Sequence, residues 1–165
     1  KYLFVESPID RNKLLTDLME VRTHICTLIV KLAARRADRQ ELEDLRETVR
    51  EMRARKDELD RTHALQFDFQ FYERLAQLSG NYILSLTFNS VKPPFWMFRP
   101  VLVKLVPAMA TMFETQEAIL TAMLQDDEED AVEMTRTWLE RGAELFLEYH
   151  KRMGDDEALT PDLEP

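Results

Sequence analysis

The segment DFQFYERLAQLSGN, residues 68 to 81, places two groups with chemical potential one helical turn apart. Asp68 and Tyr72 are four residues apart, so a helix would present both on one side, next to its apolar face. A carboxylate at such an interior edge can bind a metal ion if other ligands join it, or it can neutralise a buried cation. Tyrosine is a poor ligand for most metals. The apolar face itself is predicted from Phe67, Phe71, Leu75 and Leu78.

Arg22 is the second residue that demands a chemical explanation. It stands between Val21 and Ile25, on a helical face that the sequence predicts to be buried. A buried guanidinium needs an acidic partner, because an uncompensated charge is costly away from water. That partner could be a protein carboxylate such as Asp68 or an anionic ligand, and the sequence leaves both alternatives open.

Groups of the catalytic kind are scarce. The three histidines, His24, His63 and His150, are isolated from one another, and the chain contains no HExxH, CxxC, GxSxG or glycine-rich phosphate motif. Cys26 is the only cysteine, which rules out an internal disulfide and favours a reducing compartment. Its place on an apolar stripe predicts an inert, buried thiol. We therefore expect a cytoplasmic protein that is not an enzyme.

The charge balance excludes a DNA-binding surface of the usual kind. The 165 residues include 22 Lys and Arg against 31 Asp and Glu, a net charge of -9, whereas phosphate-binding surfaces carry a basic excess. Arginines are dense between Arg35 and Arg61, but acids such as Glu47 alternate with them, so a solvated and self-paired helix face is expected. No apolar run approaches the roughly 20 residues of a membrane span.

The elements that must position these groups are helices. The apolar period predicts an all-α fold, a single antiparallel bundle of about six helices. Asp38 should cap the second helix, the Ser79, Gly80, Asn81 run should end the third and cap the fourth, and acids from 126 to 130 should cap the last. Pro93 and Pro94 should break the fourth helix and leave 93–100 as a loop. The expected ranges are about 10–37, 38–56, 59–78, 82–92, 101–124 with a bend at Pro107, and 127–153.

Two apolar sets complete the prediction. The buried stripe of the first helix is expected to consist of Leu14, Leu18, Val21, Ile25, Leu28, Ile29 and Leu32. A second set either lines a long apolar pocket or is plain core, namely Phe95, Trp96, Met97, Phe98, Met109, Met112 and Phe113.

Three segments carry a resemblance to a known family. LMEVRTHICTLIVKLAARRA, DFQFYERLAQLSGN and QEAILTAMLQDDEEDAVEMTRTWLERG resemble, in order and spacing, the C-terminal effector domain of FadR-type members of the GntR transcription regulators. The resemblance implies a linker remnant at 1–10, a ligand-binding and dimerisation domain at 11–153, and a flexible tail at 154–165. It also implies a winged-helix DNA-binding domain before this chain, so that operator DNA is bound only through that missing part.

Many members of this family hold a metal ion through an aspartate and three histidines. Those positions carry over here as Asp68, Tyr72, Gln116 and Trp138, of which only the aspartate is a typical ligand. We therefore expect neither a metal nor another cofactor. Ligand contacts are expected from Arg22, Asp68, Tyr72, Asn81, Gln116, Trp138 and Gly142.

The expected function follows from the resemblance. The VRTHICT segment is similar to the metal-free fatty-acid regulators of the family, which implies a fatty acid or an acyl-CoA as effector. Two alternatives remain: a metal-independent sensor of a small carboxylate held by Arg22, and a ligand-free structural dimerisation module. A homodimer is expected, through either the apolar seam of the second helix or the PPFWMF segment, with no membrane association.

Overall fold

The computed structural model describes residues 11–105 and 109–153, and within these ranges the chain is helical with no strand. This confirms the all-α class. The described elements are α1 (Arg11–Arg36), α2 (Arg39–Ala54), a 3-10 turn η1 (Lys56–Glu58), α3 (Arg61–Leu78), α4 (Tyr82–Met97), α5 (Arg99–Leu105), α6 (Met109–Leu124) and α7 (Glu128–Met153).

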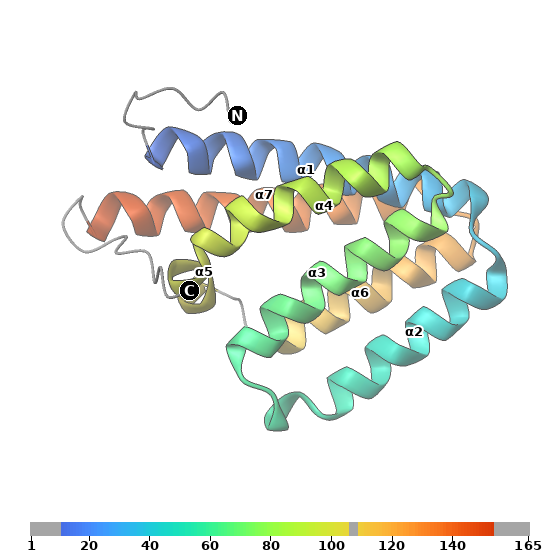
Figure 1. Ribbon diagram of the computed structural model, residues 1–165. Coiled ribbons are helices and arrows are strands. Elements are labelled where there is room, and N and C mark those ends of the chain that lie inside the picture. Colours follow the sequence, from blue (N-terminus) through green and yellow to red (C-terminus); the bar gives the residue numbers. More distant parts are fainter. Residues whose placement is uncertain (1–10, 106–108, 154–165) are drawn as a thin grey trace.

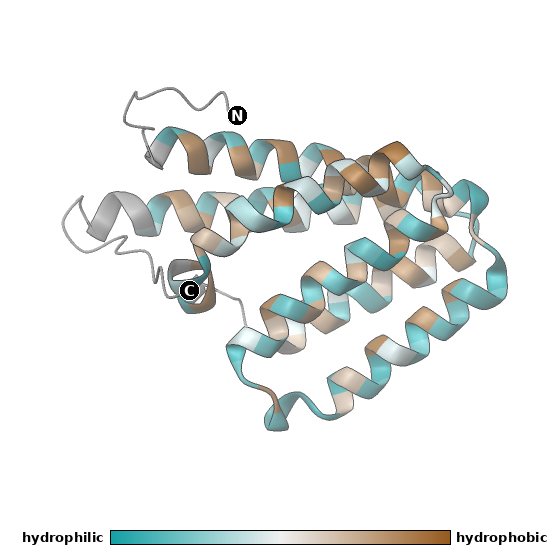
Figure 2. Ribbon diagram, in the orientation of Figure 1, coloured by the Kyte–Doolittle hydropathy of each residue, from teal (hydrophilic) through white to brown (hydrophobic). Residues whose placement is uncertain are grey.

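The helices form one bundle in which α3 and α6 lie inside (Figure 1). The two longest helices, α1 and α7, run antiparallel along one side, and Arg35 of α1 pairs with Glu128 at the start of α7. On the opposite side α2 packs against α6. Figure 2 shows that α2 is largely hydrophilic, with apolar residues only at intervals. Its buried residues are Leu42, Leu45 and Val49, so the predicted seam is covered within the chain.

Local capping signals are confirmed where the structure describes them. The Asp38 side chain accepts a hydrogen bond from the Gln40 backbone N–H at 2.8 Å, and α2 begins at the next residue. Gly80 has a positive φ of 65°, which suits a residue without a Cβ at the end of α3. Asn81 then caps α4 by accepting from the Leu84 N–H at 3.1 Å.

The prediction that Pro93 and Pro94 break the fourth helix is wrong, because α4 continues through both to Met97. Each proline removes one hydrogen bond to a carbonyl four residues earlier. Those carbonyls belong to Asn89 and Ser90, which are exposed, so water can satisfy them. Beyond the prolines, Phe95 is buried in the core, and its burial favours continuing the helix.

The single helix predicted at 101–124 is instead two helices, so the described residues form seven α-helices where about six were predicted. α5 begins at Arg99 and contacts α3 and α7, whereas α6 packs mainly on α2 and α7. The two helices therefore pack against different sets of neighbours. The predicted bend at Pro107, like the linker at 1–10 and the tail at 154–165, lies outside the described residues.

The predicted stripe of α1 is also partly wrong. Val21 and Leu28 are each 45% exposed, although the three-and-four spacing placed them in the core. Leu18 and Ile29 of the predicted stripe are buried, and the inward face also carries Met19 and Cys26, which the prediction left out. Because α1 is apolar on more than one side, its sequence alone does not select the buried face.

Arg46 of α2 pairs within its own helix, with Glu43, but the main partners of Arg50 and Arg53 lie on another helix. Arg50 is 3.8 Å from Glu47 on its own helix, yet it donates to Glu117 of α6 at 2.6 Å. Arg53 reaches Glu114 of α6 at 2.8 Å. These pairs tie α2 to α6 across a partly exposed surface. Among the described helices, none has a stretch sufficiently long and apolar for a membrane crossing.

Candidate functional site

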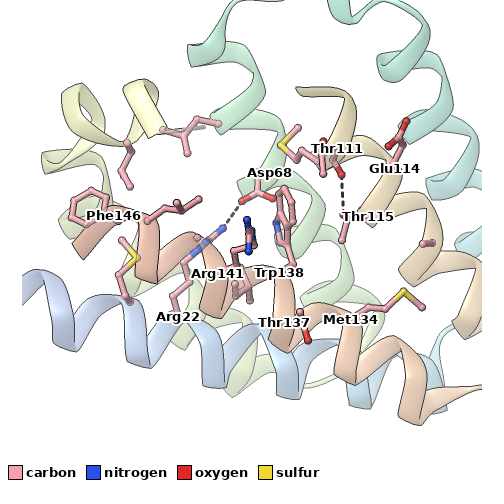
Figure 3. Close-up of a pocket in the computed structure, with 18 of the residues that line it drawn as sticks. Arg22, Asp68, Thr111, Glu114, Thr115, Met134, Thr137, Trp138, Arg141 and Phe146 are labelled. Atoms are coloured by element: carbon pink, nitrogen blue, oxygen red, sulfur yellow. Dashed lines mark hydrogen bonds and ion pairs between the residues drawn. The ribbon is translucent and has the colours of Figure 1, made fainter. Parts of the chain in front are cut away.

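A cavity of about 790 Å³ opens between the helices, with residues of α1, α3, α4, α5, α6 and α7 in its wall (Figure 3). Most of the wall is apolar, as in sites for small organic ligands. The apolar lining consists of Met19, Leu65, Phe95, Leu102, Met112, Ala118, Met134, Trp138, Leu139, Leu145 and Phe146. The polar lining consists of Arg22, Asp68, Thr111, Glu114, Thr115, Asp130, Glu133, Thr137 and Arg141, and Gly142 completes the wall.

A buried ion pair forms one side of this cavity. Arg22 of α1 donates from Nη2 to the Asp68 carboxylate on α3, so the pairing that the sequence offered as an alternative is present. The other Asp68 oxygen accepts from Gln116 Nε2 of α6 at 3.2 Å. Asp68 is 6% exposed. Both carboxylate oxygens are therefore occupied by protein donors.

Helical spacing explains why these charges meet. Arg22 follows Met19 by three residues and precedes Cys26 by four, so it shares their inward face. Asp68 follows Leu65 by three residues, with the same result on α3. Where the two faces meet, opposite charges cancel, and a buried charge persists only under that condition.

Aromatic rings enclose the Arg22 guanidinium. Its central carbon lies 5.0 Å from the Phe95 ring centre, 5.4 Å from that of Phe69 and 5.8 Å from that of Tyr72, within cation–π range. Burial by itself lowers the pKa of this guanidinium, but the Asp68 carboxylate, together with the neighbouring Cys26 and Tyr72 side chains, outweighs that effect and the pKa is raised. Arg22 therefore remains charged.

Three polar atoms around this pair are buried without a hydrogen-bond partner among the described residues. They are Arg22 Nε, Gln116 Oε1 and the Tyr72 hydroxyl. Burial, followed by the neighbouring Asp68 charge, raises the pKa of Tyr72 well above its ordinary value, so the phenol stays neutral. Unpaired buried polar groups are costly, so three of them around one ion pair need a physical explanation.

Cys26 lies in the same region and is fully buried. Burial raises the pKa of its thiol to about 12, an effect that outweighs the opposing influence of Arg22. The thiolate is therefore absent at neutral pH, in agreement with the predicted inert thiol.

The seven predicted ligand-contact residues fall into two groups. Arg22, Asp68, Trp138 and Gly142 line the cavity, and Figure 3 shows Trp138 reaching into it from α7. A Cβ added at Gly142 would meet no atom within 4 Å, so this residue leaves open space in the wall.

The other three are near the cavity or remote from it. Gln116 and Tyr72 stand behind the lining, where Gln116 bonds Asp68 and Tyr72 packs below Arg22. Asn81 serves as the cap of α4 and is absent from the cavity wall. Direct ligand contacts by all seven residues stay a prediction.

The aromatic and methionine residues between Phe95 and Phe113 were predicted to be either the lining of a long apolar pocket or plain core. Only some of them line the cavity. Phe95 and Met112 line it, whereas Phe98 and Phe113 are buried core residues outside the lining. Trp96 packs on Phe69 with ring centres 5.6 Å apart. The side chain of Met109 lies outside the described residues, and Met97 is exposed.

The residues at the inherited metal positions do not fit a divalent ion. Asp68 already accepts hydrogen bonds from Arg22 and from Gln116. Gln116 itself occupies one of the positions at which other family members carry a metal-binding histidine. Over the described ranges, no three His, Cys, Asp or Glu side chains gather closely enough to hold a metal. Trp138, at another of these positions, adds apolar surface to the cavity wall, which suits an apolar ligand.

Sequence reasoning missed several lining residues, most importantly Arg141. It lies on α7 three residues after Trp138, so the same helical face carries both. That spacing was a usable signal once Trp138 had been singled out. The threonines at 111, 115 and 137 carried no such signal.

The amino-acid sequence matches the model of one known protein family. The model of the FCD domain, the C-terminal effector-binding domain of GntR-family regulators, matches residues 17–141. The match covers well over half of the chain, and the chain belongs to this family. It is accordingly a ligand-sensing regulatory domain of the GntR class. A comparison with curated proteins gave no match.

Proposed function

We propose that this domain senses a fatty acid or an acyl-CoA in the cavity beside Arg22, without a metal ion, and catalyses no reaction. FCD domains belong to transcription regulators, which supports the absence of catalysis. The observation that carries the choice of effector is the shape and lining of the cavity. A small polar acid would leave most of a largely apolar space of about 790 Å³ unfilled.

The length of the lining supports a chain-like ligand. On α7 the wall extends from Asp130 to Phe146, and this stretch of helix measures about 24 Å at 1.5 Å per residue. Leu145 and Phe146 stand at one end of it, and Leu102 of α5, a helix that contacts α7, adds further apolar surface to the cavity. An extended acyl chain matches a wall of this length better than a compact metabolite does.

The charges at the other end favour a free fatty acid over an acyl-CoA. Glu114, Asp130 and Glu133 line that part of the wall, and the phosphates of coenzyme A would be repelled by them. Phosphate recognition generally relies on clustered Arg and Lys. The free acid is therefore the leading candidate, and the acyl-CoA is an outcome for the experiment to distinguish.

Homodimerisation belongs to the same proposal. The large exposed apolar side chains include Tyr82, Ile83 and Leu86 of α4, which are 88%, 71% and 65% exposed, and Val21 and Leu28 of α1. α1 and α4 contact each other, and Figure 2 shows hydrophobic residues near the start of α4 beside α1. Exposed apolar patches of this kind are typical of interaction surfaces, and a second copy of the chain is the partner that two-fold operators favour.

Ligand binding would act through this dimer. A ligand shifts the equilibrium between two arrangements only to the extent that it binds one of them more tightly. In a cytoplasmic regulator, the shift would change the relative placement of two winged-helix domains and thereby the affinity for operator DNA. A ligand in contact with α1, α3 and α7 at once is suited to move these helices relative to one another.

The direct experiment is mass spectrometry of small molecules extracted from the purified chain. A bound fatty acid supports the proposal in its leading form, and an acyl-CoA supports its second form. A small polar acid favours the sensor held by Arg22. An empty protein that also fails to bind added dodecanoic acid favours the structural module and contradicts the proposal.

A variant that fills the cavity locates the binding site. Gly142→Leu adds a side chain where the first atom meets no neighbour, so the fold should persist while the cavity shrinks. Dodecanoic acid should then bind at least about tenfold more weakly, as expected when about 1.4 kcal/mol or more of contact is lost. Glu140→Leu is the matched control, because Glu140 is exposed on the same helix and outside the lining. Equal affinities in the two variants would exclude this cavity as the site.

A further inference from the structure

Six charged side chains line the cavity, and most of them already have partners. Arg22 pairs with Asp68 within the wall. Glu114 pairs with Arg53 of α2 at 2.8 Å. Glu133 pairs with Arg136, one turn along α7. Two lining charges have no ion pair among the described residues, Asp130 and Arg141.

Arg22 is poorly placed to receive the acid group of a ligand. Its Nη2 donates to Asp68, three aromatic rings surround it, and its unpartnered Nε is shielded from solvent. A second carboxylate at this guanidinium would lie close to Asp68, and two like charges at short distance repel each other strongly. The wall around Arg22 is thus neutral as a whole.

Arg141 has the opposite properties. It is exposed while lining the cavity, so its guanidinium is hydrated and able to exchange water for a ligand. Figure 3 shows it reaching from α7 alongside Trp138, toward the side of the cavity that holds Arg22 and Asp68. Next to it, Gly142 contributes no side chain and leaves room for an approaching group. A planar guanidinium with several donors suits a carboxylate well.

We infer that Arg141, and not Arg22, binds the acid group of the effector. This inference rests on the proposed function and adds the direction in which the ligand lies in the cavity. The acid group lies at Arg141, and the apolar chain extends toward Leu145, Phe146 and Leu102. The reverse direction would place the chain against Asp130, about 16 Å from Arg141 along the helix, where the wall is acidic.

The test compares dodecanoic acid with dodecanol, which has the same apolar chain and no charge. Binding of each to the 165-residue chain is measured by calorimetric titration for the wild type, Arg141→Met and Arg141→Lys. Arg74→Met is the matched control, because Arg74 is an exposed arginine outside the cavity wall. Wild type and control should bind the acid about tenfold or more tightly than the alcohol, as a hydrogen bond between charged groups provides.

In Arg141→Met this preference should vanish through loss of acid affinity, while the affinity for dodecanol stays unchanged. Arg141→Lys should keep part of the preference, because it keeps the charge but not the planar fork. An acid preference that survives in Arg141→Met overturns the inference and leaves the proposed function intact. The same holds if the wild type binds both probes equally. If the wild type binds neither probe, the proposed function fails together with the inference.

Discussion

Removing Arg22 tests the central ion pair of the site most directly. In Arg22→Met the Asp68 carboxylate would remain buried, with the 3.2 Å bond from Gln116 Nε2 as its only remaining side-chain hydrogen bond among the described residues. Methionine replaces the stem of the arginine with an apolar side chain, so the main loss is the charge that neutralises Asp68.

The expected magnitude follows from that stranded charge. Breaking a buried ion pair by removing one partner costs about 3–5 kcal/mol. In a domain of this size each kcal/mol lowers the melting temperature by about 2–4 °C, so a fall of roughly 6–20 °C is expected. The double variant Arg22→Met with Asp68→Leu should recover much of this loss, because an apolar pair removes the uncompensated charge.

Thermal unfolding followed by far-UV circular dichroism measures these differences. Arg74→Met serves as the control, because the Arg74–Glu41 pair at 3.4 Å is exposed and should be worth less than about 1 kcal/mol. If Arg22→Met melts within the range of this control, the reasoning that Asp68 depends on Arg22 is refuted. If the double variant is as unstable as the single one, Arg22 contributes through packing instead of charge.

Three further predictions concern assembly, composition and reactivity. The chain should be a dimer by light scattering, and Ile83→Asp should yield a monomer with an unchanged helical spectrum; a dimer in both would place the interface elsewhere than on α4. Elemental analysis should find no stoichiometric zinc, nickel or manganese, and about one such ion per chain would contradict the ligand argument. Cys26, whose thiol pKa is raised by burial to about 12, should resist alkylation at pH near 8 until the chain unfolds. Rapid labelling of the folded protein would show that the thiol is accessible.

The sequence by itself determined the features that depend on neighbouring residues. The caps at Asp38 and Asn81 are each built from hydrogen bonds spanning two or three residues, so their signals are local. The partnership of Arg22 with Asp68 was one of two readable alternatives, because a guanidinium on an apolar face requires an anion and few acids lie on such faces. The motifs that identify the family of transcription regulators could also be read from the sequence, because each is a contiguous segment.

The tertiary structure decided what depends on competition between distant parts of the chain. Pro93 and Pro94 favour a break locally, but burial of Phe95 against α3 outweighs two lost hydrogen bonds whose carbonyls face water. Which apolar face of α1 turns inward was settled by its neighbours, and Val21 was left exposed. Arg141 entered the cavity wall because α7 packs beside α1 and α6, and no pattern within α7 specifies those partners. Short-range signals act within a few residues, whereas a cavity is the space that several helices leave between them, so its lining emerges only when they pack.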